Sequence, residues 1–302
     1  MIALGLAFVT LLSATTAAQD RSVLQADPPK KCDSCEAWNG PREPFRVFGN
    51  TYFVGPARLG AVLIASDEGH ILLDGGLPQS APLIDASIRK LGFRTEAIRL
   101  IVNSHAHYDH AGGIAALQRW SGATVAASPS GALALEQGGP PADDPQYAFG
   151  HQANGYPRVK GVRVVKDGET LRVGKLAITA HLTPGHTPGS TAWTWRSCEG
   201  VRCLDIVYAD SLTPVAAPGF RFTGDASRPS LVDSFRRSIA KVAGLPCDVI
   251  LAVHPDFADM DGKLRRREQG TDSDPFVDPK ACRAYAADAT KRLAHRVAEE
   301  RR

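Results

Sequence analysis

The sequence lacks two features that would place it in large functional classes: a strong net charge and a long hydrophobic run. Basic residues exceed acidic ones by only a little, and the formal net charge is +3 in 302 residues. A charge this small argues against a nucleic-acid-binding protein. No segment reaches the roughly 18 consecutive apolar residues that a membrane-spanning helix needs. We therefore expect a globular protein without a nucleic-acid partner and without a membrane span.

The N-terminus differs in composition from the rest of the chain. Residues 2–12 are almost wholly apolar, and residues 13–18 are small, which is typical of a signal peptide with cleavage near Ala18. No lysine or arginine precedes the apolar run, so a buried N-terminal helix is the alternative. We predict a signal peptide at 1–18, an N-terminal lead-in at 19–40 that is disordered through Pro29, and one functional domain at 41–302.

Six cysteines support export, because an even number in a secreted chain suggests disulfides. The candidate pairs are Cys198 with Cys203, Cys247 with Cys282, and Cys32 with Cys35. The first pair lies between two strand-like runs, so a bridge there would staple a hairpin turn. The second would pin the last helix to the body of the domain. The third would close a small loop, although a CxxC pair can also be redox-active or bind metal.

Strands followed by helices occur in both halves of the chain. The first half predicts strands at 45–54, 61–65, 70–74, 98–103 and 124–127, with helices at 81–91, at 114–120 and from Pro129. The second half predicts strands at 162–165, 170–173, 176–181, 191–195, 204–209 and 249–253, with helices at 231–242 and 281–298. This order predicts an α/β fold of two mixed β-sheets packed face to face, with helices outside. Residues 138–157 are predicted to form a long loop, and loops of that length are usually functional or mobile.

Four metal-capable side chains are crowded into one turn of the chain. His105, His107, Asp109 and His110 follow the apolar run 98–103 and precede small residues. Packing alone does not call for three histidines and an aspartate at the end of a buried strand. The cluster therefore predicts a metal site.

Two further histidines stand in the same position relative to a strand. His186 and His254 each follow an apolar strand, so their side chains can converge with the first cluster at one edge. Six nitrogen and oxygen ligands exceed the four of one tetrahedral zinc, but they fit two metals with three protein ligands each. Imidazole and carboxylate without thiolate suit zinc best, with iron or manganese as alternatives. Three protein ligands per metal leave open positions, which is typical of a catalytic site.

The HxHxDH motif, a distant Gly-His and a late histidine together resemble the metallo-β-lactamase superfamily over about residues 45–296. The chain is most similar to the third subclass of the class B β-lactamases, which are secreted zinc enzymes. His110 is present as a sixth ligand, and Ser211 stands where other subclasses carry a zinc-binding cysteine. Cys247 and Cys282 match a disulfide typical of the subclass.

The resemblance implies a four-layer αββα sandwich. It also implies hydrolysis of the β-lactam amide of penicillins, cephalosporins and carbapenems by a metal-bound hydroxide, and hence antibiotic resistance. It assigns His105, His107 and His186 to a first zinc, and Asp109, His110 and His254 to a second. Asp109 would also orient the hydroxide, Ser211 and Thr213 would contact the substrate carboxylate, and Gln146 would reach the carbonyl region. We further expect a periplasmic monomer.

Two other functions stay open. Glyoxalase II-like thioester or lactone hydrolases of the same superfamily use an aspartate to bridge both metals, and Asp210 occupies the matching place here. The signal-like N-terminus, the cysteine pairs and the long loop favour the lactamase instead. The other alternative is a secreted protein that stores or senses zinc, against which the open coordination positions argue.

The remaining polar and aromatic candidates receive supporting roles. We expect Asp74 to support the metal turn from outside the ligand set. His181 is an alternative ligand because it lies close to His186 in the sequence. The other predictions are a turn position for His70, the site mouth for His151, a helix surface for His295, and either pocket wall or packing for Trp38 and Phe149.

Overall fold

A computed structural model of the protein describes residues 23–302. The predicted signal peptide and the first residues of the predicted lead-in lie outside this part of the chain. Within residues 23–302, no helix combines the length and apolar character that crossing a membrane requires.

Strands and helices follow one another along the chain in nearly the predicted order. The first sheet contains β1 (Phe45–Phe48), β2 (Thr51–Phe53), β3 (Val62–Ile64), β4 (His70–Leu73), β5 (Ile98–Val102), β6 (Thr124–Ala127) and β7 (Arg163–Val164). The second contains β8 (Thr170–Val173), β9 (Leu176–Leu182), β10 (Thr191–Glu199), β11 (Arg202–Ala209) and β12 (Val249–Ala252). The helices are α1 (Cys35–Trp38), α2 (Ala81–Lys90), α3 (Tyr108–Ala111), α4 (Ile114–Ser121), α5 (Pro129–Gln137), α6 (Gly150–Asn154), α7 (Val232–Gly244), α8 (Met260–Glu268) and α9 (Ala281–Glu299). Short 3-10 helices add turns at Pro78–Ser80, Thr95–Ala97, Tyr147–Phe149 and Pro255–Ala258.

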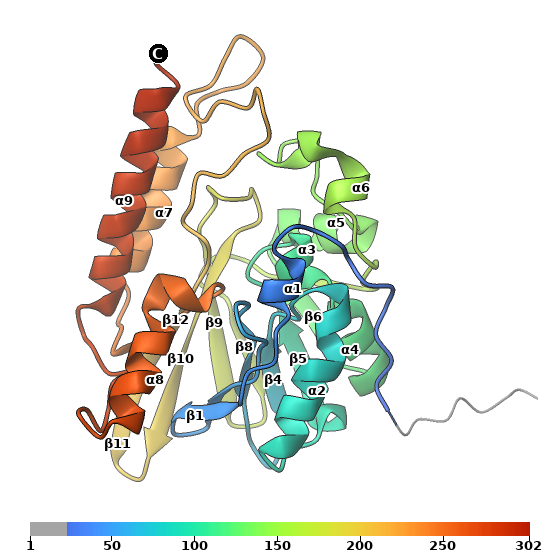
Figure 1. Cartoon of the computed structure of the whole chain (residues 1–302), viewed down its shortest axis with the longest axis vertical. Coiled ribbons are helices and arrows are strands. Elements are labelled where there is room, and N and C mark those ends of the chain that lie inside the picture. Colours follow the sequence, from blue (N-terminus) through green and yellow to red (C-terminus); the bar gives the residue numbers. More distant parts are fainter. Residues whose placement is uncertain (1–22) are drawn as a thin grey trace, which may run out of the picture.

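The two sheets lie between two layers of helices, with α2 and α4 on one side and α7 and α9 on the other (Figure 1). The first sheet follows the order β1 to β7, and the second the order β12-β11-β10-β9-β8. In the first sheet, the pairs β1–β2, β2–β3 and β3–β4 are antiparallel, whereas β4–β5, β5–β6 and β6–β7 are parallel. In the second sheet, β11 and β12 are parallel and the other pairs are antiparallel, so both sheets are mixed. The predicted αββα sandwich is confirmed.

Alternation along the strands explains why these segments are apolar on both faces. Val62 and Ile64 of β3 belong to the core between the sheets, which also contains Trp193 and Tyr208. Leu63, between them, packs in the core under α2 and α4. Successive side chains of a strand point to opposite faces, so a strand that is covered on both faces, such as β3, is apolar at every position.

Several elements differ from the prediction. The short helices α1, α3 and α6 were not predicted, and α6 lies within the predicted loop 138–157. The predicted strand 45–54 is divided into β1 and β2 because Gly49 turns the chain in the left-handed region, with φ of 54°. Strand β7, predicted with the second half, instead pairs in parallel with β6 at the edge of the first sheet. Helix α8 was not predicted, because its sequence MDGKLRRRE has no clear apolar stripe.

The lead-in packs against the domain from its first described residues, so the prediction of disorder through Pro29 is wrong there. Leu24 is only 2% exposed and joins the core under α2 and α4. Lys30 donates from Nζ to the backbone carbonyl oxygens of Gln152 (2.8 Å) and Gly155 (3.1 Å). The lead-in is thereby tied to the end of α6, within the long loop 138–157.

The structure joins the six cysteines in the three candidate pairs. Cys198–Cys203 closes the β10–β11 hairpin. Cys247–Cys282 connects the segment before β12 to the start of α9. Cys32–Cys35 closes the loop that leads into α1.

Candidate metal centre

The loops that follow β5, β9 and β12 bring the six predicted ligands together. The first loop carries His105 and His107 and leads into α3, which carries Asp109 and His110, and the other two loops carry His186 and His254. His105, His107 and His186 form one group, in which the ligand atoms all lie within 4.8 Å of one another. All three side chains are buried. The structure thus unites the three histidines that were assigned to the first zinc.

The second predicted set is just as compact. Asp109 Oδ2 lies 3.2 Å from His110 Nε2 and 3.4 Å from His254 Nε2, and the two imidazole nitrogens are 3.3 Å apart. Three ligands bonded to one tetrahedral zinc at about 2.0–2.2 Å would be separated by about 3.3–3.6 Å. The three atoms therefore already have nearly the spacing that a shared zinc ion requires. His105 also lies within 4.8 Å of Asp109 and His110, so the two sets adjoin.

Hydrogen bonds on the far side of the rings fix which nitrogen faces the cluster. Nδ1 of His105 lies 2.5 Å from Asp210 Oδ1, and Nδ1 of His186 lies 2.8 Å from the carbonyl oxygen of Thr213. Nδ1 of His254 lies 3.3 Å from the carbonyl oxygen of Arg58. An imidazole that donates its Nδ1–H to an acceptor keeps Nε2 unprotonated, and such outer contacts orient metal-binding histidines.

His107 is held in the opposite sense, by a residue that sequence reasoning missed. Its Nε2 lies 3.2 and 3.3 Å from the two carboxylate oxygens of Asp144, so its Nδ1 is left for a metal. Asp144 Oδ1 also accepts a hydrogen bond from the backbone N–H of Gln146 (2.8 Å). The only sequence signal was a pair of aspartates in the long loop, which does not distinguish Asp143 from Asp144.

Asp74 supports the turn between β5 and the first ligands, as predicted. The side chain is fully buried, and its Oδ1 accepts from Asn103 Nδ2 (2.9 Å) and from the N–H of Ser104 (2.8 Å). Its Oδ2 accepts from Ser104 Oγ (2.7 Å) and Tyr208 Oη (2.9 Å). The carboxylate thus fixes the residues that immediately precede His105 and connects them to β11 in the second sheet.

Burial sets the charge state of two ligand histidines, His105 and His186. It lowers the pKa of His186 to about 3 and holds the pKa of His105 well below its usual value, with further lowering by neighbouring histidines. Both rings are therefore neutral at pH 7, which is the form that binds metal. Burial works to raise the pKa of Asp109, but His110 and His254 together hold it well below its usual range, so this ligand is ionised.

Comparison with known proteins assigns the fold and its cluster to a family. A model of the metallo-β-lactamase superfamily matches residues 60–254, which is more than half of the chain. The chain belongs to the metallo-β-lactamase superfamily. The matched segment contains all six candidate ligands.

Solved structures agree with the predicted third subclass of this superfamily. The Rm3 metallo-β-lactamase is 50% identical with a TM-score of 0.86, over 90% of this chain and 100% of that one. MEM-A1, a subclass B3 metallo-β-lactamase isolated from a soil metagenome library, is 49% identical with a TM-score of 0.83, over 87% and 98% of the two chains. The resemblance to the third subclass is confirmed.

A curated relative is more distant. A hydroxyacylglutathione hydrolase from Anaeromyxobacter dehalogenans (strain 2CP-C) is 32% identical over 198 residues. The match covers 65% of this chain and spans only 60% of the length of that relative.

Two residues of this metallo-β-lactamase superfamily member that were predicted to contact substrate, Gln146 and Thr213, lie beside His107 and His186. Gln146 Nε2 lies 3.5 Å from His107 Nδ1, so the long loop does bring its amide to the cluster. Thr213 places both its carbonyl oxygen (2.8 Å) and its hydroxyl (3.1 Å) at His186 Nδ1. Both oxygens can accept from the Nδ1–H, so Thr213 orients His186, while its hydroxyl keeps a hydrogen to donate and its contact with the substrate carboxylate stays a prediction. Ser211 is 1% exposed, directly after Asp210.

The remaining histidines and aromatic residues are placed as follows. His181 is not a ligand, because its Nε2 lies 2.8 Å from Thr194 Oγ1 on the neighbouring strand. His70 does not lie in the turn, as was predicted, but is the buried first residue of β4. From there its Nδ1 accepts a hydrogen bond from the N–H of Ser66. The ring centre of Trp38 is 5.6 Å from that of His254, and His151 and His295 are exposed. Phe149, in the long loop, is 45% exposed.

Removal of the Asp144 carboxylate is expected to weaken the first metal site selectively. Without it, His107 loses the partner that fixes its orientation, and such outer contacts are usually worth about 10–100-fold in metal affinity. In Asp144→Ala we expect the affinity of the first site for zinc to be about 10–100-fold lower than in the native protein, as measured by competition with a chromogenic chelator. Asp143→Ala, an exposed neighbour in the same loop, is the control and should bind zinc like the native protein. Equal zinc affinities in the two variants would contradict the role of Asp144.

Proposed function

We propose that this protein hydrolyses the β-lactam amide of penicillins, cephalosporins and carbapenems with the help of two zinc ions, and that it thereby confers antibiotic resistance. The observation that carries the proposal is the pair of adjoining three-ligand sets at the strand ends. The similarity to subclass B3 metallo-β-lactamases over nearly their full length supports this choice of substrate.

The donor chemistry fits two zinc ions. Each set offers three nitrogen or oxygen donors without a thiolate, and the spacing of the second set matches tetrahedral coordination. Three protein ligands leave each metal an open position, as in catalytic zinc sites. When bound, zinc would supply a Lewis acid for the lactam carbonyl and lower the pKa of water enough to give a nucleophile at neutral pH.

The side chains around the two sets would position the reactants. Asp109 would bind at the second set and also accept a hydrogen bond from the attacking water, which orients it toward the carbonyl carbon. Gln146, beside His107, would donate from its amide to the carbonyl region of the substrate. Ser211 would donate from its hydroxyl to the substrate carboxylate, directly or through water.

The glyoxalase II-like alternative has less support. In the sequence it rests on Asp210 as a bridge between the metals. In the structure, Asp210 Oδ1 lies on the outer nitrogen of His105 at 2.5 Å, where it orients that ligand. The hydroxyacylglutathione hydrolase also matches a smaller share of the chain at lower identity than the subclass B3 enzymes do.

The decisive assay compares the two substrate classes on one preparation. Purified protein should hydrolyse a panel of penicillins, cephalosporins and carbapenems. A chelator should abolish the activity and added zinc should restore it, with close to two zinc ions per chain measured on the same sample. Rapid hydrolysis of a glutathione thioester or a lactone without lactam turnover would overturn the proposal. Zinc binding without turnover of any substrate would instead favour storage or sensing.

The assignment of ligands to two sites predicts an uneven loss of metal. His110 belongs to the second set alone in the proposed assignment, and its Nε2 is 3.3 Å from that of His254. We expect His110→Ala to retain about one zinc per chain, measured by atomic emission after gel filtration. His181→Ala, which changes a histidine outside both sets, should keep the native stoichiometry. Parallel loss from both sites in His110→Ala would contradict the assignment.

We further propose that the protein acts as a monomer in the periplasm. The pairing of six cysteines supports an oxidising compartment, where disulfides persist. Release of lactamase activity by osmotic shock, and a native mass near 30 kDa by light scattering (against 32.2 kDa for the full chain), would support both points.

A further inference from the structure

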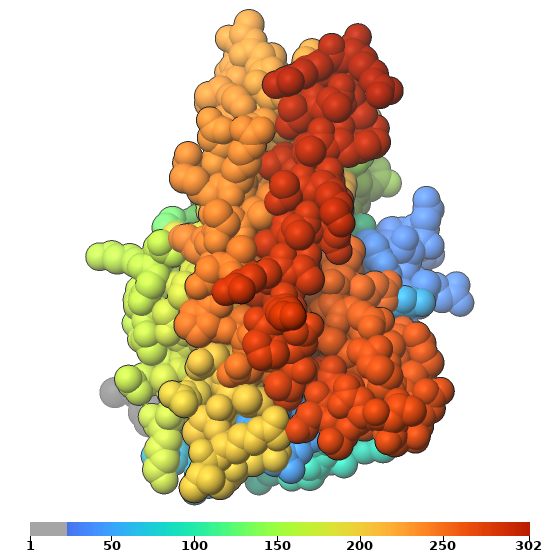
Figure 2. Space-filling view, turned by 90° about the vertical axis from the view of Figure 1, so that its left-hand side faces the viewer, coloured from blue at the N-terminus to red at the C-terminus, as the bar shows by residue number. Residues whose placement is uncertain are grey.

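Helices α7 and α9 enclose a surface groove that the proposed catalysis does not use. Figure 2 looks onto this face, where α9 runs along most of the height of the molecule. The groove holds about 640 Å³ of space between the two helices, which is within the range of small-molecule pockets. Its walls come from the two helices and the C-terminal Arg301, and no ligand of the metal centre lines it.

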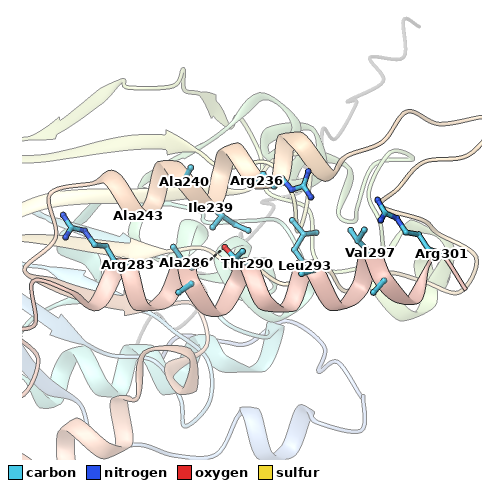
Figure 3. A pocket seen from close by; sticks show the side chains of 13 residues that line it. Arg236, Ile239, Ala240, Ala243, Arg283, Ala286, Thr290, Leu293, Val297 and Arg301 are labelled. Carbon is cyan, nitrogen blue, oxygen red and sulfur yellow. Dashed lines mark hydrogen bonds between the residues drawn. The ribbon is translucent and has the colours of Figure 1, made fainter.

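The floor of the groove is apolar. Ile239, Leu293 and Val297 form it together with alanines of both helices, as the close-up shows (Figure 3). The polar side chain among them, Thr290, donates its hydroxyl to the carbonyl oxygen of Ala286 in the same helix (2.9 Å). The floor therefore offers no free hydrogen-bonding group, and water in contact with it is readily displaced by a hydrocarbon chain.

All the charged residues that line the groove are arginines. Arg236 and Arg301 flank Leu293 and Val297 toward one end, and Arg283 lies at the other end (Figure 3). Within residues 23–302, no carboxylate lies within ion-pair distance of Arg283 or Arg301. Arg236 pairs only with Asp233 (3.1 Å), and both side chains are mostly exposed, so this pair contributes little.

We propose that this groove binds a single-chain anionic amphiphile, such as a long-chain fatty acid. The carboxylate would pair with Arg236 and Arg301, since guanidinium groups bind carboxylates with two parallel hydrogen bonds. The hydrocarbon chain would lie along the floor from Val297 toward Ala286. These two residues are about 16 Å apart along the helix, at a rise of about 1.5 Å per residue.

A second copy of this chain is a poor occupant by comparison. Residues 232–244 and 281–302 contain nine basic and four acidic side chains, whereas the whole chain has a net charge of only +3. Two such faces would repel each other. The excess of positive charge on this face instead favours an anionic ligand.

The test measures binding of monomeric dodecanoate to the full-length protein by isothermal titration, below the concentration at which the amphiphile forms micelles. We expect saturable binding of one molecule per chain, and weaker binding of uncharged dodecanol. The double variant Arg236→Gln with Arg301→Gln should bind dodecanoate at least about tenfold more weakly. Arg237→Gln with Arg302→Gln removes the same charge from neighbours that do not line the groove, and should bind like the native protein.

A steric variant separates the groove from general surface charge. Ala294 lines the groove with an exposed side chain, so Ala294→Trp should fill it, abolish dodecanoate binding and leave the thermal unfolding midpoint unchanged. Non-saturable binding, or equal weakening in the two double variants, would overturn the proposal. So would co-sedimentation with anionic phospholipid vesicles in the absence of dodecanoate binding, since the face would then recognise a membrane surface and not a free amphiphile.

Discussion

Replacing Asp109 by asparagine is expected to lower kcat for β-lactam hydrolysis by about 10²–10³-fold, the largest effect expected of a single substitution here. Asp109 is the one carboxylate in the second ligand set, with its Oδ2 within 3.4 Å of both imidazole nitrogens. Asparagine removes the negative charge that would balance a bound zinc ion. It also removes the acceptor that would orient the attacking water.

The measurement has to separate loss of metal from loss of orientation. We would measure kcat at saturating zinc, with zinc content determined on the same sample. A large fall in kcat at full zinc content would assign the effect to orientation of the water. Asp143→Asn, at an exposed position of the long loop, is the matched control and should retain native activity. An Asp109→Asn variant with kcat within about threefold of the native value would refute the proposed role.

Replacing Asp74 by alanine is expected to lower the free energy of unfolding by about 3–5 kcal/mol. Four hydrogen bonds end on its carboxylate, and all the donors belong to buried residues. Loss of the acceptor leaves these donors unpaired in the interior, and each such donor is destabilising by about 1–3 kcal/mol. The backbone adds to the effect, because Asp74 has φ of 59°, a conformation that alanine adopts less readily than aspartate.

Urea unfolding of the metal-free proteins would measure this loss without a contribution from zinc. Asp85→Ala is the control, since Asp85 is also a buried aspartate but pairs with the half-exposed Arg89 of the same helix. We expect the control to lose less than about 1 kcal/mol. Asp74→Asn should retain an intermediate stability, because asparagine keeps one acceptor and tolerates positive φ. A native unfolding midpoint for Asp74→Ala would show that the network does not hold the metal turn.

The ligand positions could be predicted because two independent signals coincide at each of them. His105, His186 and His254 are residue types that packing does not require, and each follows an apolar run that reads as a strand. Because the strands end near one edge of the sandwich, placement after a strand was enough to predict that the three side chains converge. The four layers likewise follow from the order of apolar segments and the resemblance.

Contacts between loops could not be predicted in this way. Asp144 reaches His107 across 37 residues, from a segment with no periodicity that would fix its position. Thr213 contacts His186 partly through its backbone carbonyl, which is the same in every residue type and leaves no trace in the sequence. The sequence also does not show that β7 belongs to the first sheet, because an edge strand of two residues is too short for an alternation of apolar and polar side chains.

The tie between Lys30 and the end of α6 would make turnover sensitive to the position of the N-terminus. Lys30 holds carbonyl oxygens of Gln152 and Gly155, in the same loop that carries Asp144 and Gln146 to the histidines. A peptidase that trimmed the chain beyond Lys30 would release this loop while leaving all six candidate ligands in place. Two samples of this protein that begin at different residues would then contain the same metal but differ in kinetics, so the N-terminus of each sample has to be defined before rates are compared.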